Sequence, residues 1–241
     1  AHNLFLLLRP GGRFATSGED AVGYLNRAAE LGLSRAMDQL GELYKRGNLV
    51  EAHPEESERH YRQAVEQDYQ PALFGLADLL LNHGETTPER LEEGLTLLQT
   101  AVDNDDIRAI NDWAVYNFEG IFVDKNEVEG VALFRRAVDA GNILAMRNLG
   151  VAYEYGRGVE QNLAEAQKWY QTALEGGHPD VPRDLERLAG KTPTYWYAKD
   201  DQALGPVALQ DLQALIDNGE VGSESLIWKP GLPEWIPASA D

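Results

Sequence analysis

The sequence predicts a mainly α protein: an α-solenoid of about five helix-turn-helix repeats, followed by a small α+β module. Three observations support this fold class. Shifting the chain against itself by about 36 residues brings equivalent positions into line. Small and bulky residues alternate at fixed places in the paired helices of each repeat. The period then stops near Ala189, and three of the five tryptophans follow, so a different fold begins there.

One large apolar position in each first helix sets the register. It recurs at steps of 36, 36, 37, 36 and 36 residues, as Leu4, Leu40, Leu76, Trp113, Leu149 and Leu185. Four places earlier stand Ala36, Ala72, Ala109, Ala145 and Val181. The second helices align at Ala28, Ala64, Ala101, Ala137 and Ala173, with a bulky residue three places before each. Small residues let paired helices approach closely and bulky ones fill the space between them.

The elements follow in order along the chain. Residues 1–8 are expected to be the remainder of a first helix, with residues 9–14 as its loop. Helices 34–46 and 54–68 make the next unit, and Pro54 suits a helix start because its φ is fixed. Further units span 70–104, 107–141 and 145–177. In the last of these, Gly156 and Gly158 end the first helix. A partial helix at 178–188 is expected to cap the stack.

The remaining segment loses the helical period. Residues 195–198 are expected to form a strand, 199–204 a turn, and 225–228 a second strand. Between these strands, Leu209, Leu212, Leu215 and Ile216 mark a short helix that ends at Asn218. We therefore expect two domains, a solenoid over 1–189 and a separate module over 193–241.

The repeats resemble Sel1-like repeats, which are related to tetratricopeptide repeats. The pattern AxxxLGxxYxxGxGV…A…WYxxA…G is almost complete at 145–177, and 36–47 match its first half. The units at 72–105 and 109–141 are degenerate, since Ala77 and Ala114 replace the second glycine. The resemblance implies a right-handed α-solenoid and protein–protein interaction without naming the partner.

The C-terminal module resembles bacterial GYF-like domains. The matching positions are Tyr195, Tyr197, Gly205-Pro206, Gly219, Leu226, Trp228, Gly231, Glu234-Trp235 and Pro237. The resemblance implies an aromatic cleft made of Tyr195, Tyr197, Trp228 and Trp235, of the kind that holds proline-rich peptides in eukaryotic GYF domains. The sequence departs from those domains at residues 219–221, Gly-Glu-Val in place of Gly-Tyr-Phe, and at Leu215 in place of tryptophan. We expect weak proline-rich binding at best, with docking on the solenoid as the alternative.

Composition narrows the function further. The chain has 40 acidic and 21 basic side chains, a formal charge of −19. Such a surface repels phosphate backbones and anionic lipid, so nucleic-acid and membrane-surface binding are disfavoured. The charge either serves solubility or favours a basic partner. Cysteine is absent, which excludes disulfides and thiolate chemistry, and no apolar run reaches the ~20 residues of a membrane span. The chain starts without Met in mid-repeat, which we interpret as a processed or truncated start.

No catalytic pattern stands out. The five histidines show no metal-ligand spacing, and neither a phosphate-loop ending nor a GxSxG motif is present. We therefore expect a protein that is not an enzyme and needs no cofactor or metal. The alternative is an enzyme, or an enzyme regulator, with a small-molecule site between the two modules.

The expected partner-binding surface is the concave groove lined by the first helices. Positions two and five places before and after the register residue are predicted to face it. In the repeat formed by helices 34–46 and 54–68 these are Arg35, Asp38, Glu42 and Lys45. In the later repeats the predicted set is Phe74, Asp78, Leu81, Arg108, Asn111, Val115, Phe118, Leu144, Arg147, Val151 and Glu154. Apolar side chains inside a polar rim are typical of recognition sites. The alternative is that Phe74, Leu81 and Phe118 pack on neighbouring helices.

The predicted function is therefore a scaffold, or an inhibitor of the immunity type, that captures a protein segment in this groove. The expected partner is a protein, with a secreted toxin or effector and an envelope protein as the candidates. For the chain itself we expect a bacterial origin, with the periplasm or envelope favoured over the cytoplasm.

Overall fold

The computed structural model describes residues 18–47, 49–83, 87–191, 194–200, 202–222, 224–229, 232 and 234–238. Its contacts divide the chain into two units, 1–142 and 143–241, and each is described by itself. The helix expected over 1–8 and its loop at 9–14 lie outside the described residues, as does Gly231 of the module.

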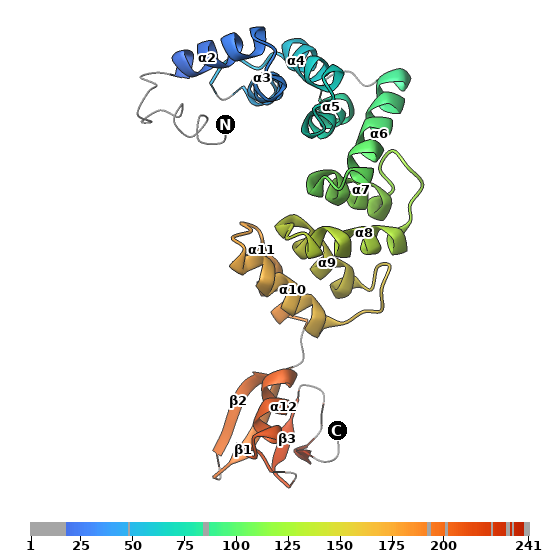
Figure 1. The fold of residues 1–241 in the computed structure, drawn as a ribbon. Coiled ribbons are helices and arrows are strands. Elements are labelled where there is room, and N and C mark those ends of the chain that lie inside the picture. Colours follow the sequence, from blue (N-terminus) through green and yellow to red (C-terminus); the bar gives the residue numbers. More distant parts are fainter. Residues whose placement is uncertain are drawn as a thin grey trace. The chain divides into compact units, whose positions relative to one another are not determined.

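The first unit consists of helices that pair along the chain (Figure 1). They are α2 (Gly18–Glu30), α3 (Ser34–Arg46), α4 (Pro54–Glu66), α5 (Pro71–Asn82), α6 (Pro88–Asp103), α7 (Ile107–Glu119) and α8 (Glu127–Asp139). The most extensive contacts join α3 to α4, α5 to α6, and α7 to α8. These pairs are the first and second helices of the predicted repeats, so the helix-hairpin architecture is confirmed.

The aligned small and bulky residues meet where paired helices touch. The ring of Tyr61 on α4 lies against Gly41 on α3, where an added Cβ would come within 2.7 Å of the ring. Real Cβ contacts are longer than this, so only glycine allows the two helices to approach so closely. Tyr61 on α4, Leu98 on α6 and Phe134 on α8 are all fully buried. The repeat of small and bulky residues in the sequence is therefore the repeat of the core.

Residues at the helix ends explain where the helices begin. Pro54 and Pro88 each stand at the first position of a second helix. Thr87 Oγ1 accepts a hydrogen bond from the Arg90 amide at 3.3 Å. Asp106 Oδ1 accepts one from the Arg108 amide at 2.9 Å, which caps α7. These side chains satisfy amide groups that have no partner inside the helix.

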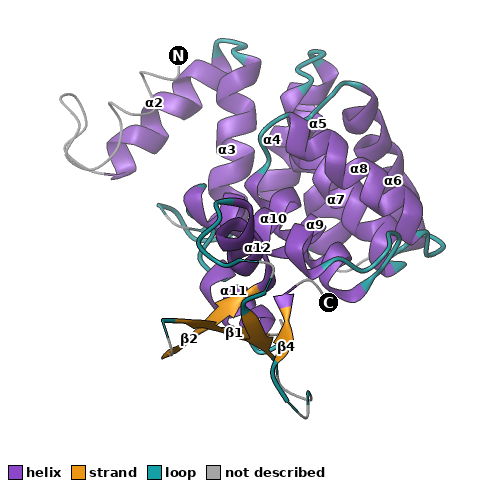
Figure 2. Ribbon diagram, turned by 90° about the horizontal axis from the view of Figure 1, so that it is seen from below, coloured by secondary structure: helices purple, strands orange, loops and turns teal. Residues whose placement is uncertain are grey.

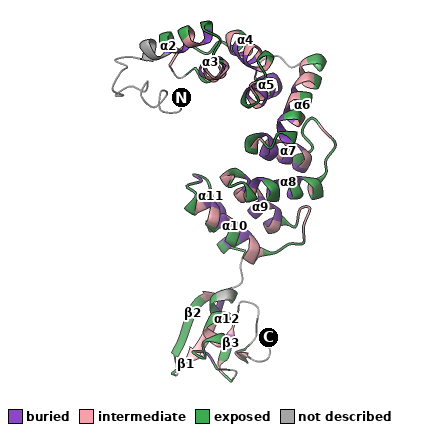
Figure 3. Ribbon diagram, viewed as in Figure 1, coloured by how far each residue is buried: buried purple, intermediate pink, exposed green. Residues whose placement is uncertain are grey.

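The second unit starts with three helices, α9 (Ile143–Tyr155), α10 (Leu163–Glu175) and α11 (Val181–Ala189). Tyr170 of α10 lies against Gly150 of α9 as Tyr61 does against Gly41, with 2.6 Å to an added Cβ. Val181 and Leu188 of α11 are buried in the same core, so α11 covers the end of this hairpin as expected for residues 178–188. Figure 3 shows that the buried residues lie where these helices face one another.

A small sheet with one helix follows within this unit (Figure 2). Its elements are β1 (Thr194–Lys199), β2 (Gln202–Ala208), α12 (Leu209–Asp217), β3 (Leu226–Trp228) and β4 (Ile236–Pro237). The strands are antiparallel in the order β2-β1-β3-β4. Tyr195, Leu212, Val221 and Ile227 form its core.

The expected turn over 199–204 is wrong in extent. Asp200 closes the hairpin in the left-handed region, with a φ of 51°, and Gln202 already pairs with Lys199. Strand β2 therefore begins at residue 202, inside the segment expected to be a turn. The fold class, a helical-repeat solenoid followed by a small α+β module, is confirmed. The domain boundary expected between 189 and 193 lies inside the second unit and stays a prediction.

Candidate functional site: a polar face across helices α3, α5 and α7

Three of the predicted groove residues belong to the hairpin core. Leu81 and Phe118 are each 3% exposed, and Glu154 is fully buried. All three stand five places after the register residue, where the first helix meets the second helix of its own hairpin. An added Cβ on Gly130 of α8 would lie 2.7 Å from Cβ of Phe118, so these two helices touch at this point. Leu81 and Phe118 therefore do not line an open groove, contrary to the prediction.

The other predicted positions differ in exposure. Phe74, Asp78, Val115, Arg147 and Val151 are half-buried, and Arg108 and Leu144 are exposed. Val151 packs against the core of the second unit. Asn111 is 4% exposed, and its amide donates to Asp112 Oδ1 at 3.1 Å. The accessible part of the predicted surface is therefore narrower than expected, and more polar.

In the first unit, side chains from three successive first helices form one connected surface. It consists of Asp38, Glu42 and Lys45 on α3, Phe74, Asp78 and Asn82 on α5, and Arg108, Asp112 and Tyr116 on α7. We call these nine residues the α3–α5–α7 face. The face follows from the repeat, because consecutive first helices lie next to one another in the stack.

Hydrogen bonds and ion pairs connect the face from helix to helix. Lys45 Nζ lies 2.9 Å from Glu42 Oε2 and 2.8 Å from Asp78 Oδ2. Asn82 Nδ2 then donates to Asp78 Oδ1 at 3.0 Å and to the hydroxyl oxygen of Tyr116 at 3.0 Å. These contacts hold the side chains of Glu42, Lys45, Asp78, Asn82 and Tyr116 in place, so this part of the face is preorganised.

An arginine lies on an aromatic ring at the same face. The guanidinium carbon of Arg108 is 4.5 Å from the centroid of the Phe74 ring. The same guanidinium donates to Asp106 Oδ2 at 2.7 Å and to the Pro71 carbonyl at 3.3 Å. These contacts fix the arginine across α5 and α7. The Phe74 ring is thus covered by a charged group, and is not the bare apolar contact that was predicted.

Two carboxyl groups of the face are poorly solvated. Burial raises the pKa of Asp38 to about 6, and the nearby Arg108 opposes this only in part. Burial likewise raises the pKa of Asp112 to about 6, against the hydrogen bond from Asn111. Neither carboxylate forms an ion pair within 4 Å with a described residue. A positive group placed beside them would lower both pKa values, so the face is suited to receive a cation.

Sequence reasoning missed Asn82, Asp112 and Tyr116. A signal was present, because Asp78 and Asn82, and likewise Asp112 and Tyr116, are spaced four residues apart on one helix. Such pairs lie one turn apart on the same side. Asp112 and Tyr116 stand one place before and three places after Trp113, and Asn82 stands six places after Leu76, so none of them falls at a position that the register selects.

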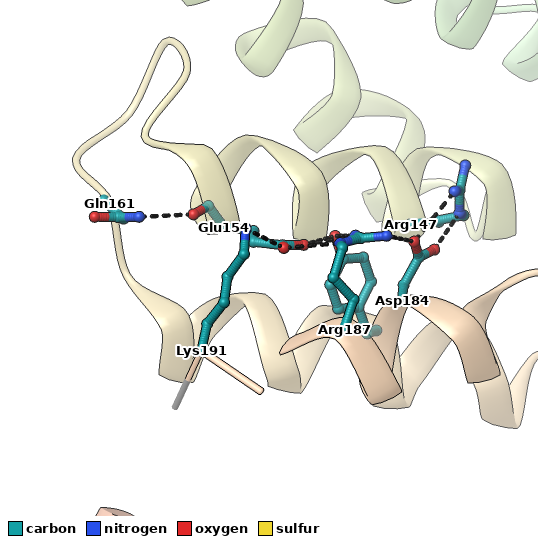
Figure 4. Close-up of polar contacts among 7 residues, drawn as sticks. Arg147, Glu154, Gln161, Asp184, Arg187 and Lys191 are labelled. Carbon is teal, nitrogen blue, oxygen red and sulfur yellow. Dashed lines mark hydrogen bonds and ion pairs between the residues drawn. The ribbon is translucent and has the colours of Figure 1, made fainter. Parts of the chain in front are cut away.

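In the second unit, two predicted groove residues are engaged by the capping helix (Figure 4). Arg147 Nε donates to Asp184 Oδ2 at 2.5 Å, and Arg187 Nη2 donates to Glu154 Oε2 at 2.7 Å. Lys191 Nζ lies 2.9 Å from Glu154 Oε1. Arg147 and Glu154 therefore bind α11 and the residue Lys191 after it, and the two buried carboxylates, Glu154 and Asp184, are each paired with basic side chains.

The four residues of the predicted aromatic cleft do not lie together on one surface of the module. Tyr195 is 5% exposed and lies in the core, where Tyr197 also packs. Trp228 pairs instead with Trp196 of β1, with ring centroids 5.1 Å apart. Because strand residues alternate between faces, these two tryptophans lie opposite their core-facing neighbours Ile227 and Tyr197. Trp235 is half-buried. Trp196 was missed as a partner of Trp228.

Two kinds of site are absent from the described residues. No group of three or more His, Asp or Glu side chains there could hold a metal ion. None of the described helices has the length and apolar character needed to cross a bilayer.

Comparisons with known proteins agree with the repeat and the module. The Sel1 repeat family model matches residues 12–33, 34–69, 107–142 and 143–178, and the GYF domain 2 model matches 195–240. No curated protein matches the sequence.

Three solved structures illustrate the likeness. A Sel1 repeat protein from Oxalobacter formigenes is 23% identical with a TM-score of 0.66, over 91% of this chain and 85% of that one. A protective antigen of uropathogenic Escherichia coli with an SLR fold is 27% identical with a TM-score of 0.60, over 70% of this chain. The match spans only 36% of that antigen. An immunity protein from Pseudomonas aeruginosa is 22% identical with a TM-score of 0.50, over 71% of this chain and 70% of that one. The matches below 25% identity support the fold alone.

Proposed function

The chain belongs to the Sel1 repeat family, and we propose that it is a non-catalytic scaffold or inhibitor that captures a segment of a partner protein on the α3–α5–α7 face. Sel1 repeats are typically protein-interaction modules. The observation that carries the proposal is the pair of carboxylates, Asp38 and Asp112, which are desolvated without an ion-pair partner among the described residues.

The proposed partner segment is basic. A lysine or arginine side chain on the face would neutralise Asp38 or Asp112 and recover part of the cost of their burial. The formal charge of −19 supports the same choice, because a negative surface attracts a basic partner and speeds the encounter. Arg108 and Lys45 lie on the same face, so the partner is expected to combine a basic residue with an acceptor group.

More specifically, we propose that the chain is an inhibitor of the immunity type. One of the matched structures is an immunity protein of Pseudomonas aeruginosa, which has the same fold at low identity. In that case the partner would be a toxin or effector. An envelope protein remains the other candidate partner.

A peptide array tests the proposal directly. Peptides of one length that differ only in lysine and arginine content are applied to the wild-type chain and to the double variant Asp38→Asn/Asp112→Asn. A second double variant, Glu66→Gln/Asp139→Asn, loses the same charge at exposed positions of second helices. We expect basic peptides to bind the wild type and this control, and to bind the first variant at least tenfold more weakly. Equal weakening in both variants would mean that only the overall charge matters, and equal binding to all three proteins would mean that Asp38 and Asp112 do not bind the peptide.

A further inference from the structure

A small cavity lies between helices α2, α3 and α4, and none of its lining residues belongs to the α3–α5–α7 face. Its lining includes Asn26 and Glu30 of α2, Met37 of α3, and Arg59, His60 and Gln63 of α4. Its volume is about 160 Å³. An engineered protein cavity of about 150 Å³ binds benzene, so the space suits a molecule of about six non-hydrogen atoms.

His60 is the most buried polar residue of this cavity, at 4% exposure. Its ring is stacked on Tyr44, with centroids 5.7 Å apart and planes within 3° of each other. Its Nε2 lies 3.2 Å from Nη2 of Arg59. A guanidinium can only donate hydrogen bonds, so Nε2 accepts, and the proton of the neutral ring is on Nδ1. Burial, followed by the charge of Arg59, lowers the pKa of His60, which is consistent with a neutral ring.

The Nδ1–H group of His60 has no partner within 3.5 Å among the described residues, although the Gln63 side chain is near enough to the ring to oppose in part the lowering of its pKa. Buried donors are nearly always paired, so an unpaired one on a side chain that lines a cavity needs an acceptor from the cavity. Arg59 adds positive charge, although its Nε and Nη2 already donate to Glu56 Oε2. The side-chain amides of Asn26 and Gln63 add further donors.

We infer that this cavity is a second site, which binds the carboxylate of a small molecule through His60 Nδ1–H and Arg59. A carboxylate supplies acceptor oxygens for both groups, and hydrogen bonds between a guanidinium and a carboxylate are stronger than those between neutral groups. Glu30, which also lines the cavity, would accept hydrogen bonds from an ammonium group, so a small amino acid fits as well as a simple carboxylic acid. The inference does not depend on partner capture at the α3–α5–α7 face.

Nuclear magnetic resonance tests the site on the full chain. The chain is labelled with ¹⁵N in its histidine rings and titrated with propionate and, separately, with alanine. We expect a saturable shift of the His60 Nδ1–H resonance with at least one ligand, and none for the exposed His53. Tighter binding of alanine would add a role for Glu30, and equal binding would mean that the carboxylate alone is recognised. If neither ligand shifts His60 at about 10 mM, the inference is wrong.

A pair of variants separates the role of the His60 Nδ1–H donor in ligand binding from the role of the aromatic ring. His60→Phe keeps an aromatic ring on Tyr44 and removes the N–H group. We expect it to weaken ligand binding about tenfold or more. His53→Phe is the matched control, because His53 also contacts the Tyr44 ring, edge to face at 6.4 Å. If His60→Phe does not fold, His60→Asn, which keeps an N–H donor, replaces it and is expected to retain binding. Unchanged affinity in a folded His60→Phe protein would overturn the inference.

Discussion

Arg187 on α11 donates a hydrogen bond from Nη2 to Oε2 of Glu154 on α9 at 2.7 Å, although Glu154 is fully buried. Arg187 Nε donates to the other carboxylate oxygen at 3.0 Å, and the Tyr170 hydroxyl donates at 2.6 Å. Burial alone would raise the pKa of Glu154, but the hydrogen bonds from Arg187, Tyr170 and Lys191 outweigh it and lower the pKa to about 2. The buried charge therefore ties the capping helix to the last repeat.

The two partners of this pair should not be equivalent on mutation. Arg187→Met leaves a buried carboxylate with fewer donors, and we expect it to destabilise the second unit by about 3 kcal/mol. Glu154→Gln removes the buried charge and keeps a polar group, so its cost should be nearer 1 kcal/mol. Hydrogen exchange of the α11 amides measures both changes locally. Equal losses of stability in the two variants would show that leaving the buried carboxylate without its arginine is not the main cause of destabilisation.

The Asp38 and Asp112 carboxyl groups of the α3–α5–α7 face have raised pKa values, whereas the pKa of Glu154 is lowered. Their effect on stability should therefore depend on pH in the opposite direction to that of Glu154. The pKa values of Asp38 and Asp112, about 6 when folded, lie above the ordinary value near 3.9. The folded chain then binds more protons between pH 4 and 6, so stability falls as pH rises through this window. We expect Asp38→Asn to stabilise the first unit by about 1–2 kcal/mol at pH 7 and hardly at all at pH 4. Urea unfolding at the two pH values is the measurement, and a pH-independent effect would contradict the prediction.

The sequence was sufficient for the helix hairpins because their contacts repeat. Ala36, Gly41 and Tyr61 recur at equivalent places, and in each hairpin a small residue must face a large one. Spacing could not tell which groove positions are open. The positions of Phe74 and Leu81 are seven residues apart, so they differ by about 20° around an ideal helix. Their burial differs because Leu81 lies where the paired helices converge, against Gly94.

Polar contacts between neighbouring repeats were also beyond the sequence. Lys45 pairs with Asp78, 33 residues away, and this depends on how two helices are aligned along their lengths. One signal was available for the core: Gly130 in the middle of a helix costs stability unless a close contact requires it, and Phe118 is that contact. In the module, the alternation of β1 could have separated Trp196 from Tyr197.

Two phenylalanines of the predicted groove should respond differently to truncation. Phe118 is buried, so Phe118→Ala should cost about 3–5 kcal/mol of stability. Phe74 is half-buried beneath Arg108, so Phe74→Ala should cost clearly less while weakening partner binding through the loss of the arginine's support. Thermal melting of both variants, followed by peptide binding of the folded ones, separates the two roles. Similar melting temperatures would mean that Phe118 is less important to the core than its burial indicates.

The domain boundary predicts where the chain can be cut. Helix α11 ends at Ala189 and β1 begins at Thr194, so a protease site inserted at 190–193 should release two folded pieces. Circular dichroism of the separated pieces is the measurement, with helical signal expected from the piece that holds the repeats. A C-terminal piece that is unfolded alone but folded in the uncut chain would show that the module needs the repeats.

The module should bind proline-rich peptides weakly, and through a different surface from the one predicted. A polyproline helix binds by laying its rings on exposed aromatic side chains. Tyr195 is buried, whereas Trp196 and Trp228 form a half-buried pair on the other face of the sheet. We expect millimolar binding at most, with shifts confined to the tryptophan indole resonances during a titration of the full chain. Trp228→Ala should abolish these shifts, while Leu209→Ala, at an exposed position of α12, should not. Shifts that survive Trp228→Ala would place the peptide elsewhere, and the absence of any shift would leave the module without a proline-rich ligand.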